Sequence, residues 1–431
     1  EVRWAAQGQG VRGRPREMGP LAAWAKAGDG SGSQRRPART WPPKASGGPR
    51  VGSASSAGDA PLPVPEGEEK SCGATLPESS SKGFQGFLRK MVSKFSHGGA
   101  GEPEPGRAAG APARTIQQTK SFRRLYDLGR ELAEPSAPGT EVRWARRRRD
   151  NVDVVVKIRR KRETYNQDNV AFSSHKEESE WREVTERLLN LPRHPHVAAL
   201  LDVFEDEEAY YVVMEQAVGT DLFETLSEQR RPWVPDTEIQ EIIRQILEAV
   251  HALHAQGCIH RDLKLDNVVL ERRMGVVVHS PSGGHVIPNV VAKLVDFDDA
   301  QVWPRADDAS GEQRCVVGTD QYIAPEAYDG DFSPASDIFA VGVVLFRLMM
   351  GRFPFNSSLF DDRPGENWVG MPKMQAIRKR LLSCTIDFGR PARNVPEPPA
   401  EAVALCRRML SQDPRARPSA AGALAHGFLA P

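Results

Sequence analysis

The sequence predicts an α+β fold in which a small β-rich lobe precedes a large helical lobe, with a disordered N-terminal tail in front of both. Apolar, β-branched runs at residues 152–158 and 210–215 are typical of buried strands, and a helical stretch lies between them at about 176–191. From Asp236 onward, apolar residues recur with the period of an α-helix. They are Ile239, Ile242, Ile243, Ile246, Leu247 and Val250. Strands early and helices late are the basis of the two-lobe prediction.

Residues 1–82 are predicted to be a disordered, low-complexity tail. They are rich in Gly, Pro, Ala, Ser and Arg and poor in β-branched and aromatic residues. Burial of apolar surface therefore cannot offset the entropy of ordering them. The run Pro-Leu-Pro-Val-Pro at 61–65 is either a polyproline II ligand or a stiff linker, and we favour the linker.

A basic amphipathic helix is predicted at residues 83–97. Its apolar residues form one helical stripe with basic residues beside and opposite it. The stripe consists of Phe84, Phe87, Leu88, Met91, Val92 and Phe95. Through residues 84–95, such a helix could bind a groove on the same chain, calmodulin or a membrane surface. The alternative is a helix that simply packs on the domain. Residues 98–120 are predicted to be a linker, and residues 121–431 the globular domain.

Charge and cysteine content narrow the function classes only slightly. A net charge of +1 favours neither a membrane nor a nucleic acid, and we expect no nucleic-acid partner. The five cysteines have no metal-ligand spacing and are expected to be scattered reduced thiols. No apolar run is long enough to span a bilayer. We expect an intracellular, cytoplasmic protein, with the nucleus left open.

Residues 260–267, His-Arg-Asp-Leu-Lys-Leu-Asp-Asn, carry the most specific chemical signal. A hydroxyl that attacks a phosphoryl group needs a carboxylate to orient it and accept its proton. It also needs an amide oxygen nearby to hold the metal that neutralises the phosphates. Asp262 and Asn267 have the spacing that this chemistry uses. Asp262 is therefore the candidate catalytic carboxylate and Asn267 a candidate metal ligand.

The order His-Arg-Asp-Leu-Lys-x-x-Asn resembles the catalytic loop of serine/threonine protein kinases. From about residue 126 to 428 the chain resembles the eukaryotic protein kinase family. The resemblance implies a bilobal protein kinase fold, ATP and Mg²⁺ as cofactors, and transfer of the γ-phosphate to hydroxyls of protein substrates. It also makes Lys264 a second catalytic residue.

Two further motifs resemble the family's phosphate and metal sites. Val154-Val155-Val156-Lys157 resembles the strand whose lysine contacts the α- and β-phosphates, and a snorkelling surface lysine is the alternative. Leu294-Val295-Asp296-Phe297-Asp298 resembles the metal-binding Asp-Phe-Gly, which makes Asp296 the second implied metal ligand. Asp298 stands where the family has glycine, whose backbone freedom aspartate lacks.

The resemblance implies a carboxylate that positions Lys157 from the helical stretch at 176–191. Glu183 stands where the family carries this residue, and Glu180 and Glu186 are alternatives one helical turn away in either direction. A solvated helix face is the simpler interpretation of any one of them.

Further residues are implied to bind the nucleoside of ATP. The hinge resemblance at 212–217 assigns the adenine hydrogen bonds to the backbone of Glu215 and Ala217, with Met214 as gatekeeper. Asp221 stands where an acidic group reaches the ribose hydroxyls. Apolar side chains are expected to pack on the adenine, namely Leu132, Val142 and Val155.

Several large-lobe markers predict specific contacts. Glu326, at the end of the motif that begins at Gly318, should pair with Arg417, and Asp337 should brace the catalytic-loop backbone. Thr319 should contact both catalytic residues. The chain between the two metal ligands is longer than usual in the family, and residues 275–291 are expected to form a protruding hairpin.

Within the family, three motifs most resemble calcium/calmodulin-dependent or calcium-dependent protein kinases. They are His194-Pro195-His196-Val197, Asp221-Leu222-Phe223 and His426-Gly427-Phe428. Arg347 departs from that group, because it occupies a position that is commonly acidic. Cys315 stands at the frequent phosphothreonine position, so we expect activity that does not depend on phosphorylation there.

Two functions are compatible with these residues. The first is an active serine/threonine kinase, and the second is a pseudokinase scaffold that binds nucleotide weakly or not at all. The second is motivated by Asp298 and by a phosphate loop that keeps only Gly139 and has two prolines, which lack N–H donors. We favour activity, because the four groups that the chemistry most needs are present, namely Lys157, Asp262, Asn267 and Asp296.

Overall fold

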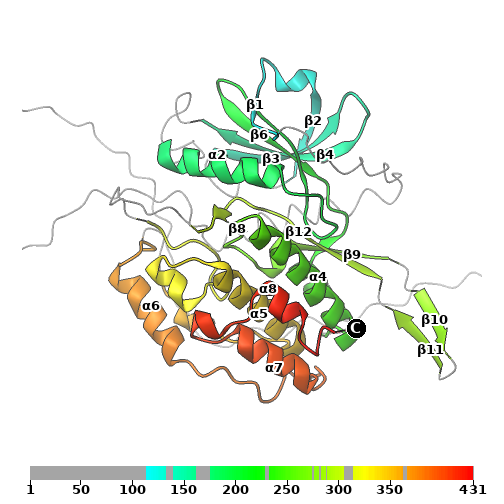
Figure 1. Cartoon of the computed structure of the whole chain (residues 1–431), viewed down its shortest axis with the longest axis vertical. Helices are drawn as coiled ribbons and strands as arrows, with labels where there is room; N and C mark the ends of the chain where they lie inside the picture. Colours follow the sequence, from blue (N-terminus) through cyan, green and yellow to red (C-terminus); the bar gives the residue numbers. More distant parts are fainter. Residues whose placement is uncertain are drawn as a thin grey trace, which may run out of the picture. The chain divides into compact units, whose positions relative to one another are not determined.

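The computed structural model describes residues 113–132, 139–161, 175–228, 233–273, 276–280, 283–287, 289–304, 314–362 and 366–430. The predicted tail at 1–82, the basic helix at 83–97 and most of the linker lie outside these residues and stay predictions. Within the described ranges, the strand-rich first part and the helix-rich second part confirm the two-lobe α+β prediction (Figure 1).

The small lobe is built on a six-stranded sheet with the order β1-β5-β6-β4-β3-β2. Its strands are β1 (Gln117–Gln118), β2 (Tyr126–Glu131), β3 (Thr140–Arg147), β4 (Asp153–Arg160), β5 (Leu200–Glu205) and β6 (Ala209–Glu215). Neighbouring strands are antiparallel except β1, which runs parallel to β5. The strands predicted at 152–158 and 210–215 correspond to β4 and β6.

The predicted boundary at residue 121 is too late, because the domain begins within the expected linker. Ile116 is 9% exposed and belongs to the main hydrophobic core. Gln117 and Gln118 pair with Phe204 and Glu205 of β5. An edge strand of two residues has no periodic pattern to read, so composition alone could not place this boundary.

Strand β4 is buried on both faces, and its alternation directs Lys157 toward one of them. Val154, Val156 and Ile158 pack in a cluster on one face. Val155 packs in a different cluster on the other. Because side chains alternate along a strand, Lys157 shares the face of Val155. This face is lined by the residues expected to contact the nucleotide.

Helix α2 (His175–Leu189) lies along the sheet of the small lobe (Figure 1). It corresponds to the stretch predicted at 176–191. Its buried residues recur at helical spacing and include no carboxylate. They are Trp181, Val184, Thr185, Leu188 and Leu189.

The large lobe is mainly helical. Its α-helices are α3 (Leu222–Glu228), α4 (Asp236–Ala255), α5 (Pro334–Met350), α6 (Pro372–Ser383), α7 (Ala400–Met409) and α8 (Ala420–Leu424). The predicted apolar stripe of α4, from Ile239 to Val250, is at most 2% exposed. Short 3₁₀ turns, one of them in the small lobe, are η1 (Phe122–Arg124), η3 (Leu265–Asn267), η4 (Pro325–Asp329), η5 (Ser357–Leu359) and η6 (Pro414–Ala416).

Helix α5 is the centre of the large lobe and is apolar nearly all round. Ser333 caps its N-terminus in a reciprocal capping box with Ser336, and Gly351 ends it with φ of 68°. A Cβ at Gly342 would lie 2.9 Å from Cβ of Met409. The absence of a side chain at Gly342 therefore allows α5 and α7 to pack closely.

Short strands carry the loops of the site. One sheet has the order β12-β9-β7, formed by β12 (Val290–Leu294), β9 (Val268–Arg272) and β7 (Thr220–Asp221). A second pairs β8 (Cys258–Ile259) with β13 (Gln301–Val302). The predicted hairpin is confirmed as β10 (Val276–Ser280) paired with β11 (Gly283–Ile287), and it projects away from the helices (Figure 1).

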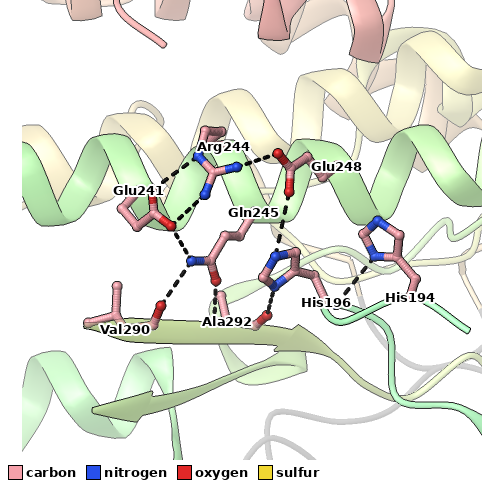
Figure 2. Close-up of polar contacts among 8 residues, drawn as sticks. All are labelled: His194, His196, Glu241, Arg244, Gln245, Glu248, Val290 and Ala292. Atoms are coloured by element: carbon pink, nitrogen blue, oxygen red, sulfur yellow. Dashed lines mark hydrogen bonds and ion pairs between the residues drawn. The ribbon is translucent and has the colours of Figure 1, made fainter. Parts of the chain in front are cut away.

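The loop after α2 is anchored to α4 and β12 by a polar network (Figure 2). His196 is 9% exposed, and its Nδ1 lies 2.9 Å from the backbone oxygen of Ala292. Gln245 of α4 donates to the oxygen of Val290 at 2.9 Å and accepts from the N–H of Ala292 at 2.6 Å. Burial lowers the pKa of His196, so the imidazole is neutral at neutral pH. This network attaches the small lobe to the strand that precedes Asp296.

Three of the five cysteines match the expectation of reduced thiols. Cys258, Cys384 and Cys406 are free thiols. In the described ranges, no helix combines the length and apolar character that crossing a bilayer requires.

Candidate active site

The catalytic loop is held by a buried carboxylate of α5. Asp337, which is 2% exposed, accepts from the backbone N–H groups of His260 at 2.9 Å and Arg261 at 3.0 Å. His254 lies 2.9 Å from the same carboxylate. Burial opposes ionisation of Asp337, but the hydrogen bond from His254 and the other donors outweigh it and lower its pKa. The predicted brace is therefore confirmed, and Arg261 keeps its positive φ of 68° within it.

Asp262 lies at the centre of a hydrogen-bond network with the residues predicted to surround it. Thr319 donates to Asp262 Oδ1 at 2.7 Å. Lys264 Nζ lies 2.7 Å from Asp262 Oδ2 and 2.8 Å from the Thr319 hydroxyl. Burial favours a neutral Lys264, but the Asp262 carboxylate outweighs it and raises the pKa of Lys264. The network fixes the Asp262 carboxylate beside a permanent cation.

Asn267 is oriented so that one of its amide atoms lacks a partner. Its Nδ2 donates to the backbone oxygen of Asp262 at 2.8 Å and to the Asp262 carboxylate at 3.1 Å. Its Oδ1 is buried and has no hydrogen-bond partner among the described residues. A buried acceptor without a partner is costly, and a metal ion bound to Oδ1 would relieve this cost.

Strand pairing brings Asn267 close to Asp296. The N–H of Val295 donates to the backbone oxygen of Asn267 at 3.0 Å, immediately before Asp296. An amide oxygen and a carboxylate are donors that Mg²⁺ prefers. Asn267 and Asp296 therefore fit the expected metal. The described ranges hold no group of three or more His, Cys, Asp and Glu residues that could bind a metal ion.

Lys157 forms ion pairs with two carboxylates that follow β12. Its Nζ lies 3.0 Å from Asp296 Oδ1, and it also contacts the carboxylate of Asp298. Burial favours the neutral lysine, but both carboxylates outweigh it and raise the pKa of Lys157. Burial likewise opposes ionisation of Asp296, yet Lys157 lowers its pKa. Both groups are therefore charged, and the snorkelling alternative for Lys157 is wrong.

Glu183 does not contact Lys157, so the expected ion pair between these two residues is not formed. The side chain of Glu183 is 59% exposed and forms an ion pair at 3.0 Å with Arg187, one turn along α2. Glu180 is exposed as well, and Glu186 accepts from the backbone N–H of Ile116 at 3.1 Å. The helical spacing of Trp181, Val184 and Leu188 already implies this result, because it places Glu183 outside the buried stripe.

Replacing Glu183 with Gln should therefore leave the KM for ATP unchanged. Its exposed ion pair contributes at most about 1 kcal/mol to stability, so the melting temperature should shift only slightly. Steady-state kinetics and thermal unfolding of the Glu183→Gln variant measure both. A large rise in the KM for ATP would show that Glu183 takes part in nucleotide binding.

The residues expected to pack on adenine form one hydrophobic cluster. Leu132, Val142, Val155 and Ala217 are all buried in it, and Met214 packs against its edge. Val269 is also buried there, at 0% exposure, and was not expected from the sequence. The sequence position of Val269, two residues after Asn267 in an apolar run, is the signal that indicates its place in this cluster. The role of these residues in binding adenine stays a prediction.

Two polar residues expected at the nucleoside have partners within the protein. The carboxylate of Glu215 pairs with Lys293 at 2.5 Å. Asp221 is fully buried, and its Oδ1 accepts from the N–H of Glu224 at 2.6 Å, at the start of α3. Burial raises the pKa of Asp221 to about 7. Its Oδ2 has no hydrogen-bond partner among the described residues, so the ribose contact stays a prediction.

The predicted structural ion pair of the large lobe is confirmed. Arg417 binds Glu326 through two hydrogen bonds, Nη1 to Oε1 at 2.6 Å and Nη2 to Oε2 at 2.9 Å. Arg417 also donates to the backbone oxygens of Ser411 at 2.8 Å and Ala335 at 3.0 Å. The pair holds Glu326, at the end of the motif that begins at Gly318, against α5 and η6.

Comparison with known proteins agrees with this geometry. Residues 139–429, more than half of the chain, match the model of the protein kinase domain. Calcium-dependent protein kinase 8 of Arabidopsis thaliana is 30% identical over 249 residues, which cover 58% of this chain and 40% of that protein. Calcium-dependent protein kinase SK5 of Glycine max is 26% identical over 315 residues, covering 73% of this chain and 53% of that protein.

A similar protein from Homo sapiens is the hormonally up-regulated neu tumor-associated kinase. It is 27% identical over 282 residues, which cover 64% of this chain and 32% of that protein. The chain thus spans about a third to a half of the length of these curated relatives. The match to the domain model, together with the network around Asp262, establishes that the chain belongs to the protein kinase family.

Proposed function

We propose that this chain is an active serine/threonine protein kinase that uses ATP and Mg²⁺. The observation that carries the proposal is the network in which Thr319 and Lys264 both contact the Asp262 carboxylate, at 2.7 Å each. Each carboxylate oxygen has two lone pairs, so Asp262 can still accept a hydrogen bond from a substrate hydroxyl. Asp262 would orient that hydroxyl and accept its proton during transfer.

The neighbouring charges would serve the phosphates of ATP. Lys264, held beside Asp262, offsets negative charge that gathers as the hydroxyl attacks. Lys157 supplies a second cation on the nucleotide face of β4. Asn267 Oδ1 and Asp296 would hold Mg²⁺, which when bound neutralises phosphate charge. The protein's contribution is mainly to position these groups.

A pseudokinase scaffold is the second candidate, and one contact favours it. The carboxylate of Asp298 contacts Lys157, which is the cation proposed to bind phosphate. A carboxylate in this place could compete with ATP. The purified chain, incubated with labelled ATP, Mg²⁺ and a generic basic protein, distinguishes the two. Label on the substrate that disappears with EDTA supports the kinase, and its absence despite ATP binding supports the scaffold.

Replacing Asp296 with Ala should abolish Mg²⁺-dependent nucleotide binding. The variant removes the only carboxylate of the proposed metal pair, while Asp298 still neutralises Lys157. Calorimetry with ATP in the presence of Mg²⁺ and of EDTA measures this. If ATP binding depends on Mg²⁺ equally in the variant and the wild type, Asp296 is not a metal ligand.

Phosphatase treatment should leave most of the kinase activity. Arg261, the usual partner of an activating phosphate, donates to the backbone oxygen of Asp299 and lies over the Phe332 ring, 5.3 Å from its centroid. Its guanidinium is thus engaged without a phosphate. Activity is measured before and after treatment, with Ser310→Ala as the companion variant, whose position lies outside the described residues. A large loss in both would make Ser310 a regulatory switch.

Contact with calmodulin or a membrane surface through residues 84–95 is part of the same proposal. It is supported by the stripe of apolar residues and by the similarity to calcium-dependent protein kinases, and that segment lies outside the described residues. We propose protein substrates because the chain belongs to the protein kinase family.

A further inference from the structure

Lys157 is a buried cation whose ion pairs are made with the segment after β12, and not with α2. Its side chain is 6% exposed, and its partners are Asp296 and Asp298. The buried face of α2 has no carboxylate, and Glu183 points to Arg187. A buried ammonium group needs an anionic partner, and this partner must stay in place when ATP and the metal bind. Asp296 is proposed to bind metal, so it cannot serve Lys157 alone.

Asp298 is placed to serve two cations of β4. Besides contacting Lys157, its Oδ2 lies 3.5 Å from Arg159 Nη2. The two cations are two residues apart, so strand alternation puts them on the same face of β4. Arg159 in turn lies over the Trp181 ring of α2, 5.2 Å from its centroid. One carboxylate thus connects the Asp296 segment, β4 and, through Arg159, helix α2.

The charges in this cluster explain why glycine would be unsuitable at position 298. Asp298 contacts both Lys157 and Arg159, and Asp296 contacts Lys157. Without Asp298, Lys157 would have to share Asp296 with the metal. Asp298 therefore leaves Asp296 available as a metal ligand.

We propose that Asp298 is the positioning residue for Lys157, in the place that the family pattern gives to a glutamate on α2. The inference rests on the proposed kinase function. Asp298 then compensates for the carboxylate that the buried face of α2 lacks. In the family pattern a glutamate of α2 contacts this lysine, and here Asp298, directly after Phe297, contacts it instead. Helix α2 is then joined to the site by the contact between Trp181 and Arg159.

The test compares three substitutions of Asp298 with a surface control. Asp298→Asn and Asp298→Gly should each raise the KM for ATP about tenfold, because a buried charge pair loses one partner while Asp296 remains. The KM for the protein substrate should not change. Asp298→Glu, which keeps the carboxylate, should restore most of the ATP affinity. Asp387→Asn, at a side chain that is 71% exposed, is the matched control.

Two results would overturn the proposal. An unchanged KM for ATP in Asp298→Asn would show that Lys157 needs no carboxylate at position 298. Faster turnover in Asp298→Gly would show that Asp298 competes with phosphate. A loss of melting temperature without a change in KM for ATP would assign Asp298 a structural role only, and would also reject the proposal.

Hydrogen exchange separates this inference from the proposed function. If the wild type transfers no phosphate, the kinase proposal fails, but Asp298 can still hold Lys157. Backbone amides of residues 295–300 should then exchange faster in Asp298→Asn than in the wild type and in Asp387→Asn. Equal exchange in all three proteins would overturn the inference independently of activity.

Discussion

Replacing Asp262 with Asn should lower the turnover of phosphoryl transfer by roughly 10²–10⁴-fold, the contribution typical of a positioned general base. Asparagine keeps the shape of the side chain and can still accept from Thr319, but it has no charge and cannot accept the substrate proton. ATP affinity should be unchanged, because Lys157 and Asp296 form a separate ion pair, 3.0 Å apart.

Single-turnover kinetics and calorimetry with ATP measure the two effects of Asp262→Asn separately. Thermal unfolding serves as the control, since Lys264 loses an anionic partner in this variant. A variant that is folded, binds ATP and transfers phosphate at the wild-type rate would exclude Asp262 from the chemistry.

Replacing Arg417 with Ala should destabilise the domain by about 3–5 kcal/mol, because it leaves the Glu326 carboxylate buried without its charge partner. The Arg417 side chain is 0% exposed and the Glu326 side chain 11%. Arg417 also lies over the Phe339 ring, 4.8 Å from its centroid, so the substitution removes packing as well as charge.

Denaturant unfolding of Arg417→Ala beside Arg352→Ala measures this effect. Arg352 makes a surface ion pair with Asp387, with side chains 33% and 71% exposed, and its loss should cost about 0–1 kcal/mol. Equal destabilisation in the two variants would mean that the buried pair contributes no more than a surface pair.

The catalytic loop was the part of the site most accessible to sequence reasoning. Asp262, Lys264 and Asn267 lie within six residues, so their relative positions depend on a local turn and not on how distant elements pack. The brace from Asp337 and the contact with Thr319 followed from motifs that accompany this loop. The strands β4 and β6 and the helix α4 were predictable because each repeats one apolar pattern over several residues.

The carboxylate for Lys157 could not be predicted from motif position alone. Whether a helix residue faces a strand depends on the rotation of the helix about its axis, and one residue of offset turns a side chain by about 100°. The apolar stripe of α2 fixed that rotation and placed Glu183 outward. Asp298 was noted as a departure from glycine, but only the fold places it against both Lys157 and Arg159.

The most direct test of kinase activity is mass spectrometry of a protein substrate after incubation with the purified wild-type chain, ATP and Mg²⁺. The Asp262→Asn variant, prepared in the same way, controls for contaminating kinases. An active serine/threonine kinase gives phosphoserine or phosphothreonine with the wild type and almost none with the variant. Equal phosphorylation by both, or none by a wild type that binds ATP, would contradict the assignment.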